Sequence, residues 1–344
     1  MSFKAFETDD FVVSADSITA GLWTGNAPEL TAFFTSSTQV ASSNGAYYIN
    51  VYNSESYEDI QFAIAYGDVD GSGSLEFDSS VPGKSPSSTN YGQYRTLVLG
   101  DETAEFSFGG VTAPNFYVIS VERNRYKEGL FPGSTTLKLD VGGNDLYLTD
   151  NSQVATTVEF NDAGRVFQLV SGSAGTVFDT TSTGGGVDGY SASGSYGLFL
   201  PDISTYILNP SALDAATTDG GIALGTVRGD DVDSENASRL YNALTGSVSS
   251  GVGSFTANSE ETITSDFIFV RPRSSEFNYS ENPSFISGST GEVLYSSFIN
   301  NPTTYITTVG LYNDSSELLA VAKLSTPLPK DFTKEALVRV KLDF

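Results

Sequence analysis

The chain has 344 residues, with 42 Asp and Glu against 17 Lys and Arg, a formal net charge of -25, and no histidine or cysteine. The absence of these two residue types excludes Ser-His-Asp and Cys-His nucleophiles, zinc and iron–sulfur sites built on their side chains, and disulfides. The acidity repels nucleic acid and anionic membrane surfaces, so we expect neither as a partner and favour a non-enzymatic structural or binding protein.

The composition also indicates a folded, β-rich chain. Aromatic residues make up 12% of it, whereas disordered acidic chains are poor in aromatics, and Ser, Thr, Gly and Val are frequent. No stretch approaches the roughly 18 to 20 apolar residues of a membrane span. The N-terminal sequence lacks the basic and then apolar pattern of a signal peptide. We therefore expect that the protein is made in a soluble compartment and that it does not insert into a membrane.

Period-two alternation of apolar and polar residues predicts short strands along most of the chain. We expect strands at residues 47–52, 59–66, 94–99, 115–123, 135–141, 145–148, 166–170, 197–200, 205–208, 267–270, 302–312, 317–324 and 336–344. Turn-forming residues separate these runs, which is typical of antiparallel sheets. The predicted fold is mainly β, with two or more antiparallel β-sandwich or barrel-like domains and one or two short helices.

One segment has a helical pattern, at residues 235–244. Its apolar side chains recur at helical spacing, and acidic residues crowd the predicted first turn, where the helix dipole favours negative charge. Stretches rich in Gly, Ser and Thr at 179–194 and 245–258 suggest connections between domains. We predict an N-terminal β-rich domain at 1–180, a linker-containing middle region with the helix at 181–264, and a C-terminal β-module at 265–344.

An acidic segment has part of the pattern of a calcium loop. Asp68, Asp70 and Ser72 fall at loop positions one, three and five, and Glu76 adds a further carboxylate. Position twelve, where such a loop needs a bidentate Glu, is Ser79, and no flanking helices are predicted. An acidic β-turn is the competing interpretation, and we favour it over a metal site.

Three features are candidate interfaces, and each is also compatible with an ordinary core or a solvated charge. Trp23 is the single tryptophan and is suited to insertion into a core or a neighbour. The densest basic patch and the apolar face of the last strand are the other two, and their residues are Arg123, Arg125 and Lys127, then Val338, Val340, Leu342 and Phe344. The basic patch would dock against acidic surfaces, and the charges between the strand positions would limit premature edge pairing.

The C-terminal segments at 305–314, 317–324 and 330–344 resemble a β-module of tail-associated proteins from contractile-tailed bacteriophages. Segments at 10–20, 62–68, 91–95, 194–202 and 275–285 resemble virion structural proteins of T4-like marine phages, especially cyanophages. The resemblance implies a tail or baseplate component, with other tail proteins and further copies of itself as partners. It also implies synthesis in the host cytoplasm and residence in the virion.

These expectations assign no catalytic residue, cofactor or metal. A receptor- or glycan-binding adsorption protein and a neck or capsid accessory protein remain as alternatives. A carboxylate glycosidase is a third, although it needs two converging carboxylates. Sugar clefts are usually lined by Trp, and Trp23 is the only one in this chain.

Overall fold

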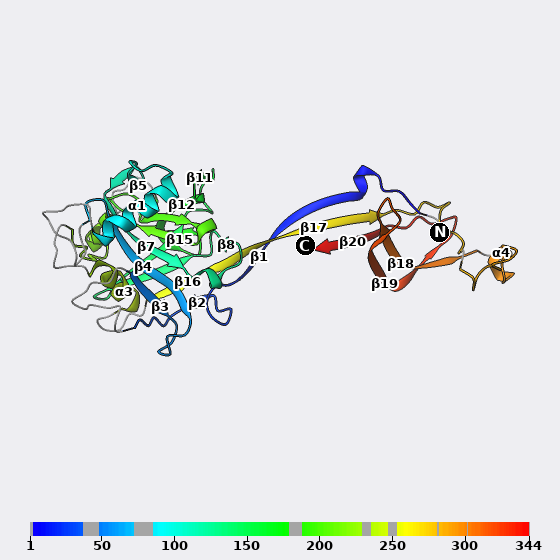
Figure 1. The fold of residues 1–344 in the computed structure, drawn as a ribbon, viewed down its shortest axis with the longest axis horizontal. Coiled ribbons are helices and arrows are strands. Elements are labelled where there is room, and N and C mark those ends of the chain that lie inside the picture. The colour runs from blue at the N-terminus through cyan, green and yellow to red at the C-terminus, as the bar shows by residue number, and fades with distance from the viewer. Residues whose placement is uncertain are drawn as a thin grey trace. The chain divides into compact units, whose positions relative to one another are not determined.

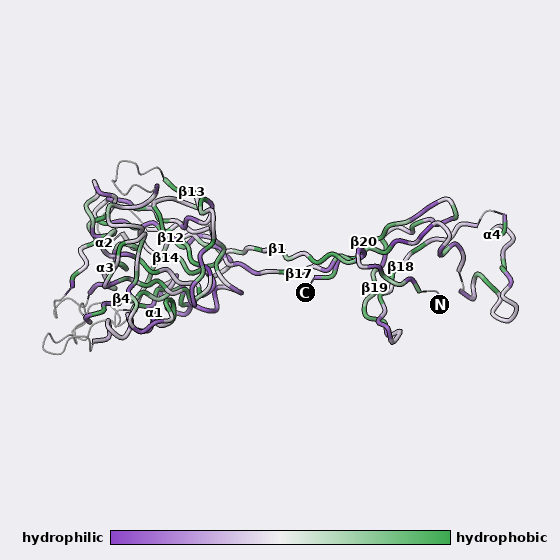
Figure 2. The backbone as a smooth tube through the Cα atoms, turned by 90° about the horizontal axis from the view of Figure 1, so that it is seen from above, coloured by the Kyte–Doolittle hydropathy of each residue, from purple (hydrophilic) through white to green (hydrophobic). Residues whose placement is uncertain are grey.

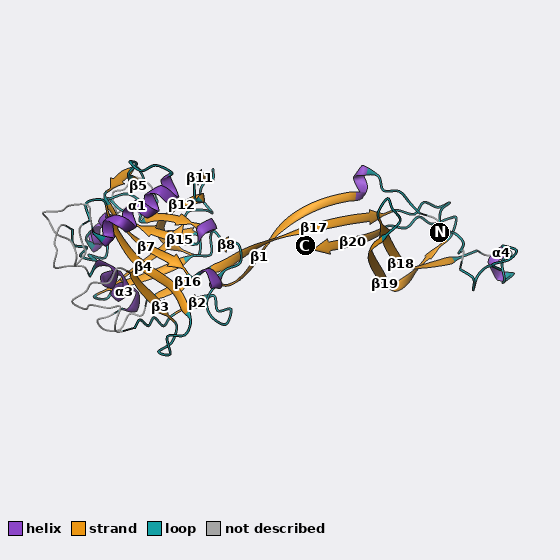
Figure 3. Cartoon of the chain, viewed as in Figure 1, coloured by secondary structure: helices purple, strands orange, loops and turns teal. Residues whose placement is uncertain are grey.

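The computed structural model describes residues 3–36, 48–71, 85–178, 188–228, 235–246, 253–280, 282–300 and 302–343. It divides into two compact units, a larger one of Ile18–Glu261 and a smaller one that joins Met1–Ser17 to Thr262–Phe344. Strands account for 44% of the structure and helices for 15%, which confirms the prediction of a mainly β fold (Figures 1 and 3).

The larger unit is built on one antiparallel sheet. Its strands follow the order β2 (Glu29–Leu30), β16 (Ser254–Thr256), β9 (Thr136–Val141), β10 (Asn144–Asp150), β12 (Gly164–Ser173), β14 (Gly197–Leu200), β15 (Thr205–Leu208), β7 (Asn115–Val121), β4 (Ile60–Asp68) and β3 (Tyr48–Tyr52). Two short strands, β11 (Glu159–Asn161) and β13 (Thr176–Val177), also pair with β12.

The sheet curls until distant strands meet across its concave face. Strands β16 and β4 lie seven places apart in the sheet order, which in a flat sheet would separate them by about 33 Å. Nevertheless, the ring of Phe255 on β16 lies 5.6 Å from that of Phe62 on β4 and 5.3 Å from that of Tyr206 on β15. The concave face therefore encloses a closed aromatic core.

Two helices of the larger unit pack on opposite faces of this sheet. Helix α3 (Asn236–Thr245) contributes the fully buried Leu240 and Leu244 to the concave core and confirms the helix predicted at 235–244. Helix α1 (Pro86–Leu99) and the hairpin of β5 (Phe106–Phe108) and β6 (Val111–Ala113) cover the convex face, where Tyr91 stacks on Phe116 with ring centroids 5.1 Å apart.

The strand predicted at 94–99 is wrong, because these residues form the last turns of α1. The alternation of Tyr94, Thr96 and Val98 resembles a strand, but Pro86 stands at the helix start, where proline is favoured. Gly100 ends the helix at a left-handed φ of 63° and donates its N–H to the carbonyl of Thr96. These two boundary residues, and burial of one helix face, outweigh local strand propensity.

The smaller unit has a thin core between two small sheets. One contains β17 (Asn258–Val270) between β1 (Phe11–Gly21) and β20 (Val338–Asp343), with residues 258–261 of β17 and 18–21 of β1 belonging to the larger unit. The other is a hairpin of β18 (Thr304–Tyr312) and β19 (Leu318–Lys330). Ile268, Val309 and Val340 are among the side chains buried in this core. Figure 2 shows hydrophobic stretches along the chain in both units, alternating with hydrophilic ones.

Short elements complete the described chain. They are β8 (Gly129–Leu130), which pairs with the start of β17, the helices α2 (Pro210–Asp214) and α4 (Ser297–Asn300), and the 3-10 turns Thr8–Asp10, Arg123–Arg125, Pro201–Ile203 and Thr217–Asp219.

The division of the chain differs from the predicted one at residue 181. The strands on either side of the predicted boundary, β12 and β14, are direct neighbours, with Phe167 opposite Phe199. Helix α3 and β16 contribute to the same concave core. The middle region therefore belongs to the larger unit, and the division between the units falls between Glu261 and Thr262, with the first 17 residues joining the C-terminal part.

Replacing Phe255 by Ala is expected to lower the free energy of unfolding of the larger unit by about 3 to 5 kcal/mol, because a large side chain is lost from the closed core. Urea titration followed by the fluorescence of Trp23, whose ring lies 4.9 Å from that of Phe255, measures the change. Phe160→Ala is the control, since that side chain is 72% exposed. Equal midpoints for the two variants would contradict the closed core.

Candidate functional site

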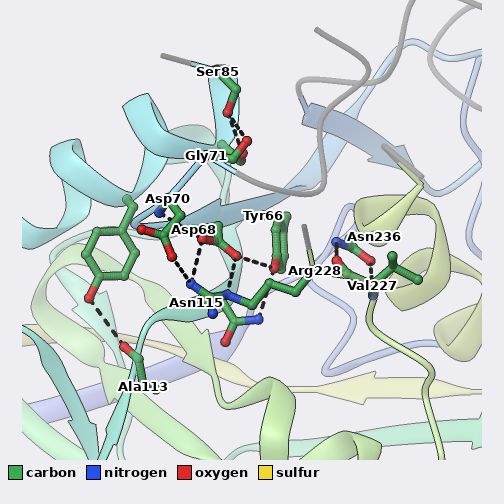
Figure 4. Close-up of polar contacts among 12 residues, drawn as sticks. Tyr66, Asp68, Asp70, Gly71, Ser85, Ala113, Asn115, Val227, Arg228 and Asn236 are labelled. Atoms are coloured by element: carbon green, nitrogen blue, oxygen red, sulfur yellow. Dashed lines mark hydrogen bonds and ion pairs between the residues drawn. The ribbon is translucent and has the colours of Figure 1, made fainter. Parts of the chain in front are cut away.

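A buried ion pair lies where β4 ends in the larger unit. The guanidinium of Arg228 donates from Nε to Oδ2 of Asp68 at 2.7 Å and from Nη2 to Oδ1 at 3.1 Å (Figure 4). The same Nη2 donates to Asp70 at 2.7 Å. The side chain of Asp68 has no exposed surface, while that of Arg228 is 37% exposed. We call these three residues the Arg228 clasp.

Neighbouring groups complete the hydrogen bonding of Asp68. The hydroxyl of Tyr66 donates to Oδ2 at 3.1 Å, and the backbone N–H of Asp70 donates to Oδ1 at 2.9 Å. Burial, and then the charge of Asp68, raise the pKa of Tyr66 above its usual range, so this hydroxyl keeps its proton. Asn115 in turn donates to the Tyr66 hydroxyl at 2.9 Å.

Each carboxylate oxygen of Asp68 thus accepts two hydrogen bonds, and its charge is matched by a guanidinium. A carboxylate held in this way has no free lone pair directed at a substrate and is a poor general base. The clasp is a structural device that fixes the chain near Arg228 to the end of β4.

The clasp also bears on the candidate calcium loop. Of the four residues of the candidate calcium loop, Asp68 and Asp70 bind Arg228, while Ser72 and Glu76 lie outside the described residues. Within the described ranges, no group of three or more acidic side chains has an arrangement that could hold a metal ion. No local sequence pattern indicates that Arg228, which is 160 residues from Asp68, is its partner.

The predicted basic patch is partly used within the chain. Arg125 donates to the Thr24 hydroxyl at 2.6 Å and lies 3.8 Å from the carboxylate of Asp59. Arg123 donates to the backbone oxygen of Tyr126 at 2.8 Å and lies over its ring. Lys127 is exposed. The patch therefore offers a single exposed ammonium and two arginines that already have contacts.

Of the two open interpretations of Trp23, the structure places the side chain in a core. The residue is 2% exposed, and its indole N–H donates to the backbone oxygen of Phe255 at 2.7 Å. It lies within the concave core and presents no surface to a neighbour.

The last strand has the alternation expected from its sequence. Val338 and Val340 are buried and Leu342 is partly buried against the same core, while Arg339 and Lys341 lie on the opposite face above the ring of Phe267. Lys341 pairs with Asp343 at 2.8 Å. Phe344 lies outside the described residues. These apolar residues hold the strand to its own unit.

The β18–β19 hairpin has an exposed apolar surface that was not predicted from the sequence. One hairpin face packs on the smaller core, and the other leaves Leu318, Leu319 and Val321 exposed by 52%, 67% and 56%. Phe3, 57% exposed, packs edge-on against Tyr312 of the same hairpin, with ring centroids 5.2 Å apart. We call Phe3, Leu318, Leu319 and Val321 the hairpin patch.

A fully buried lysine fixes the end of this hairpin. The ammonium of Lys330 donates to the backbone oxygens of Ser274 and Asp331 at 2.9 and 3.1 Å and to Oδ1 of Asn278 at 2.8 Å. Three oxygens replace its water shell, so the charge is accommodated through hydrogen bonds. The contact ties residues 274–278 to the last residue of β19.

Comparisons with protein-family models, with curated proteins and with solved structures find no match to this chain. In the described part of the chain, no helix combines the length and apolar character needed to cross a membrane.

Asp68→Asn is expected to lower the free energy of unfolding by about 3 kcal/mol, because it leaves the Arg228 charge without its buried partner. Asp70→Asn, at a side chain 67% exposed, is expected to cost less than about 1 kcal/mol. Urea titrations with calcium and with a chelator check both. A calcium-dependent midpoint in the unchanged protein would show that a metal site, and not the clasp alone, stabilises this segment.

Lys330→Met is expected to lower the stability of the smaller unit by about 2 kcal/mol, since three buried oxygens lose their donor. Hydrogen exchange read by mass spectrometry should show faster exchange for peptides covering 274–278. Lys334→Met, whose side chain is 53% exposed, is the matched control. Unchanged exchange in the Lys330 variant would refute an anchoring role.

Proposed function

We propose that this protein is a non-enzymatic structural component of a contractile-tailed phage virion, a baseplate wedge or other tail-associated part. It acts through contacts with other tail proteins or further copies of itself. The hairpin patch is the observation that carries the proposal, and the resemblance of the C-terminal segments to a tail-associated β-module supplies the kind of particle.

The patch is suited to a protein contact because its side chains are large, apolar and close together. In the register of the hairpin, Val321 lies opposite Gly310, so their side-chain directions point to the same face. A Cβ built on Gly310 would point to this face and would lie 2.9 Å from the Tyr312 ring and 3.3 Å from Leu318. Tyr312, Leu318 and Val321 therefore share the outer face of the hairpin. Covering such side chains gains roughly 25 cal/mol for each Å² removed from water.

The edge strands of the other small sheet support the same function. In β1, Phe11, Val12 and Val13 are 48%, 49% and 68% exposed, and β1 is at one end of the strand order. An exposed edge strand presents backbone groups to which a neighbour can add a strand. On β20, at the other end, Arg339 and Lys341 add charges that discourage unspecific pairing.

The hydrogen bonding of the Arg228 clasp argues against a catalytic role for its carboxylates. Asp68 and Asp70 share Arg228, and the Asp68 carboxylate is saturated by hydrogen bonds, unlike the pair of free carboxyl groups that a glycosidase needs on either side of its substrate.

Changing Leu319 and Val321 together to Asp is expected to reduce incorporation into virions at least tenfold, because two charges would have to be buried at the contact. Quantitative mass spectrometry of purified particles measures incorporation, and a reconstruction of the particle locates the chain. Phe160→Asp, at an exposed position of the larger unit, is the control and should incorporate normally. Normal incorporation of the double variant, or absence of the chain from virions, would refute the proposal.

A further inference from the structure

The larger unit contains a polar cleft of about 530 Å³ that neither the clasp nor the hairpin patch uses. It lies along β12, and β5 and β11 also contribute to its walls. Its polar lining includes Ser107, Asn151, Thr156, Glu159, Gln168 and Tyr190. The volume falls within the roughly 300 to 1,000 Å³ typical of small-molecule sites.

Two amide side chains of the lining are held in place by their oxygen atoms. Oδ1 of Asn151 accepts from the backbone N–H of Gln168 at 3.0 Å, and Oε1 of Gln168 accepts from the hydroxyl of the buried Ser195 at 2.7 Å. Among the described residues, neither Nδ2 of Asn151 nor Nε2 of Gln168 has a hydrogen-bond partner. The cleft therefore has two oriented amide groups whose N–H donors are available.

The same cleft has an acceptor and an aromatic wall. Glu159 is exposed at the cleft, and burial, followed by the charge of Glu159, raises the pKa of Tyr190, which keeps that phenol neutral. The Tyr190 ring packs closely on Gly109, where an added Cβ would lie 2.6 Å from the ring. Glycine at this position lets the ring form the cleft wall.

The chemistry of the lining selects one class of ligand. Neither Lys nor Arg is among the described lining residues, and the chain carries a net charge of -25, so an anionic ligand is disfavoured. One carboxylate is too few for a metal site. The mostly polar walls do not suit an apolar ligand. Amide donors, a carboxylate acceptor and an aromatic face together match a ring that bears hydroxyl groups.

We propose that this cleft binds a neutral saccharide. The amide N–H groups of Asn151 and Gln168 donate to sugar hydroxyls, Glu159 accepts from one or two of them, and the Tyr190 ring packs against the sugar. The site lies wholly in the larger unit, so it stands independently of the subunit contacts assigned to the hairpin patch.

Ligand-observed saturation-transfer NMR with the full chain tests the proposal. The probes are methyl α-glucoside, methyl α-mannoside, methyl β-galactoside and maltotriose, with inorganic phosphate as an anionic probe. We expect at least one neutral sugar to bind and phosphate not to compete with it. Absence of binding by all four sugars, or displacement of a bound sugar by phosphate, would overturn the assignment.

Two variants locate the binding in the cleft. Asn151→Asp keeps the acceptor for the Gln168 N–H and replaces the donor, and Glu159→Gln removes the charged acceptor, so each should weaken sugar binding about tenfold. Glu58→Gln makes the same chemical change at an exposed residue that is not among the described lining residues, and should bind normally. Trp23 fluorescence verifies folding of each variant. Equal affinity in all three would place the sugar elsewhere and refute the site.

Discussion

The larger unit depends on the meeting of β16 with β4 and β15 across the concave face of its sheet. This meeting closes a long antiparallel sheet around Phe255, Phe62 and Tyr206 and leaves room for helix α3 and Trp23. Side chains of the sheet and of the elements packed on it fill the concave face. The polar cleft along β12 lies on the opposite face, since Gln168 alternates with Leu169, which belongs to the concave core.

The few cations of this acidic chain serve largely to hold it together. Arg228 binds Asp68 and Asp70, and Arg165 binds Asp202 and Glu260 at 2.7 and 2.8 Å. Lys330 is enclosed by oxygens in the smaller unit. Cations committed to internal contacts leave the surface predominantly negative, which favours solubility and disfavours polyanionic partners. For the subunit contacts proposed above, apolar and backbone groups are therefore the main source of attraction.

The two units differ in how they use apolar residues. The larger unit encloses its aromatic side chains in the curled sheet, whereas the smaller one has a thin core and leaves the hairpin patch and much of β1 exposed. A thin core gains little stability from burial, and contact with a neighbour would cover the same side chains that now face water. This contrast agrees with the two proposals made above, in which the smaller unit makes subunit contacts and the larger unit binds a ligand.

The sequence by itself determined the β-rich class, most strands, helix α3 and the alternation of the last strand, because period-two and helical patterns report which face of an element is buried. The sequence pattern wrongly predicted a strand at the end of α1, because the features that decide for a helix there are the proline at its start, the glycine at its end and the burial of one face. Tertiary structure alone decided that Trp23 lies in the core, that Asp68 meets Arg228 across 160 residues, and that Asn151 and Gln168 share a cleft. These pairings depend on how far the sheet curls, which no local pattern specifies.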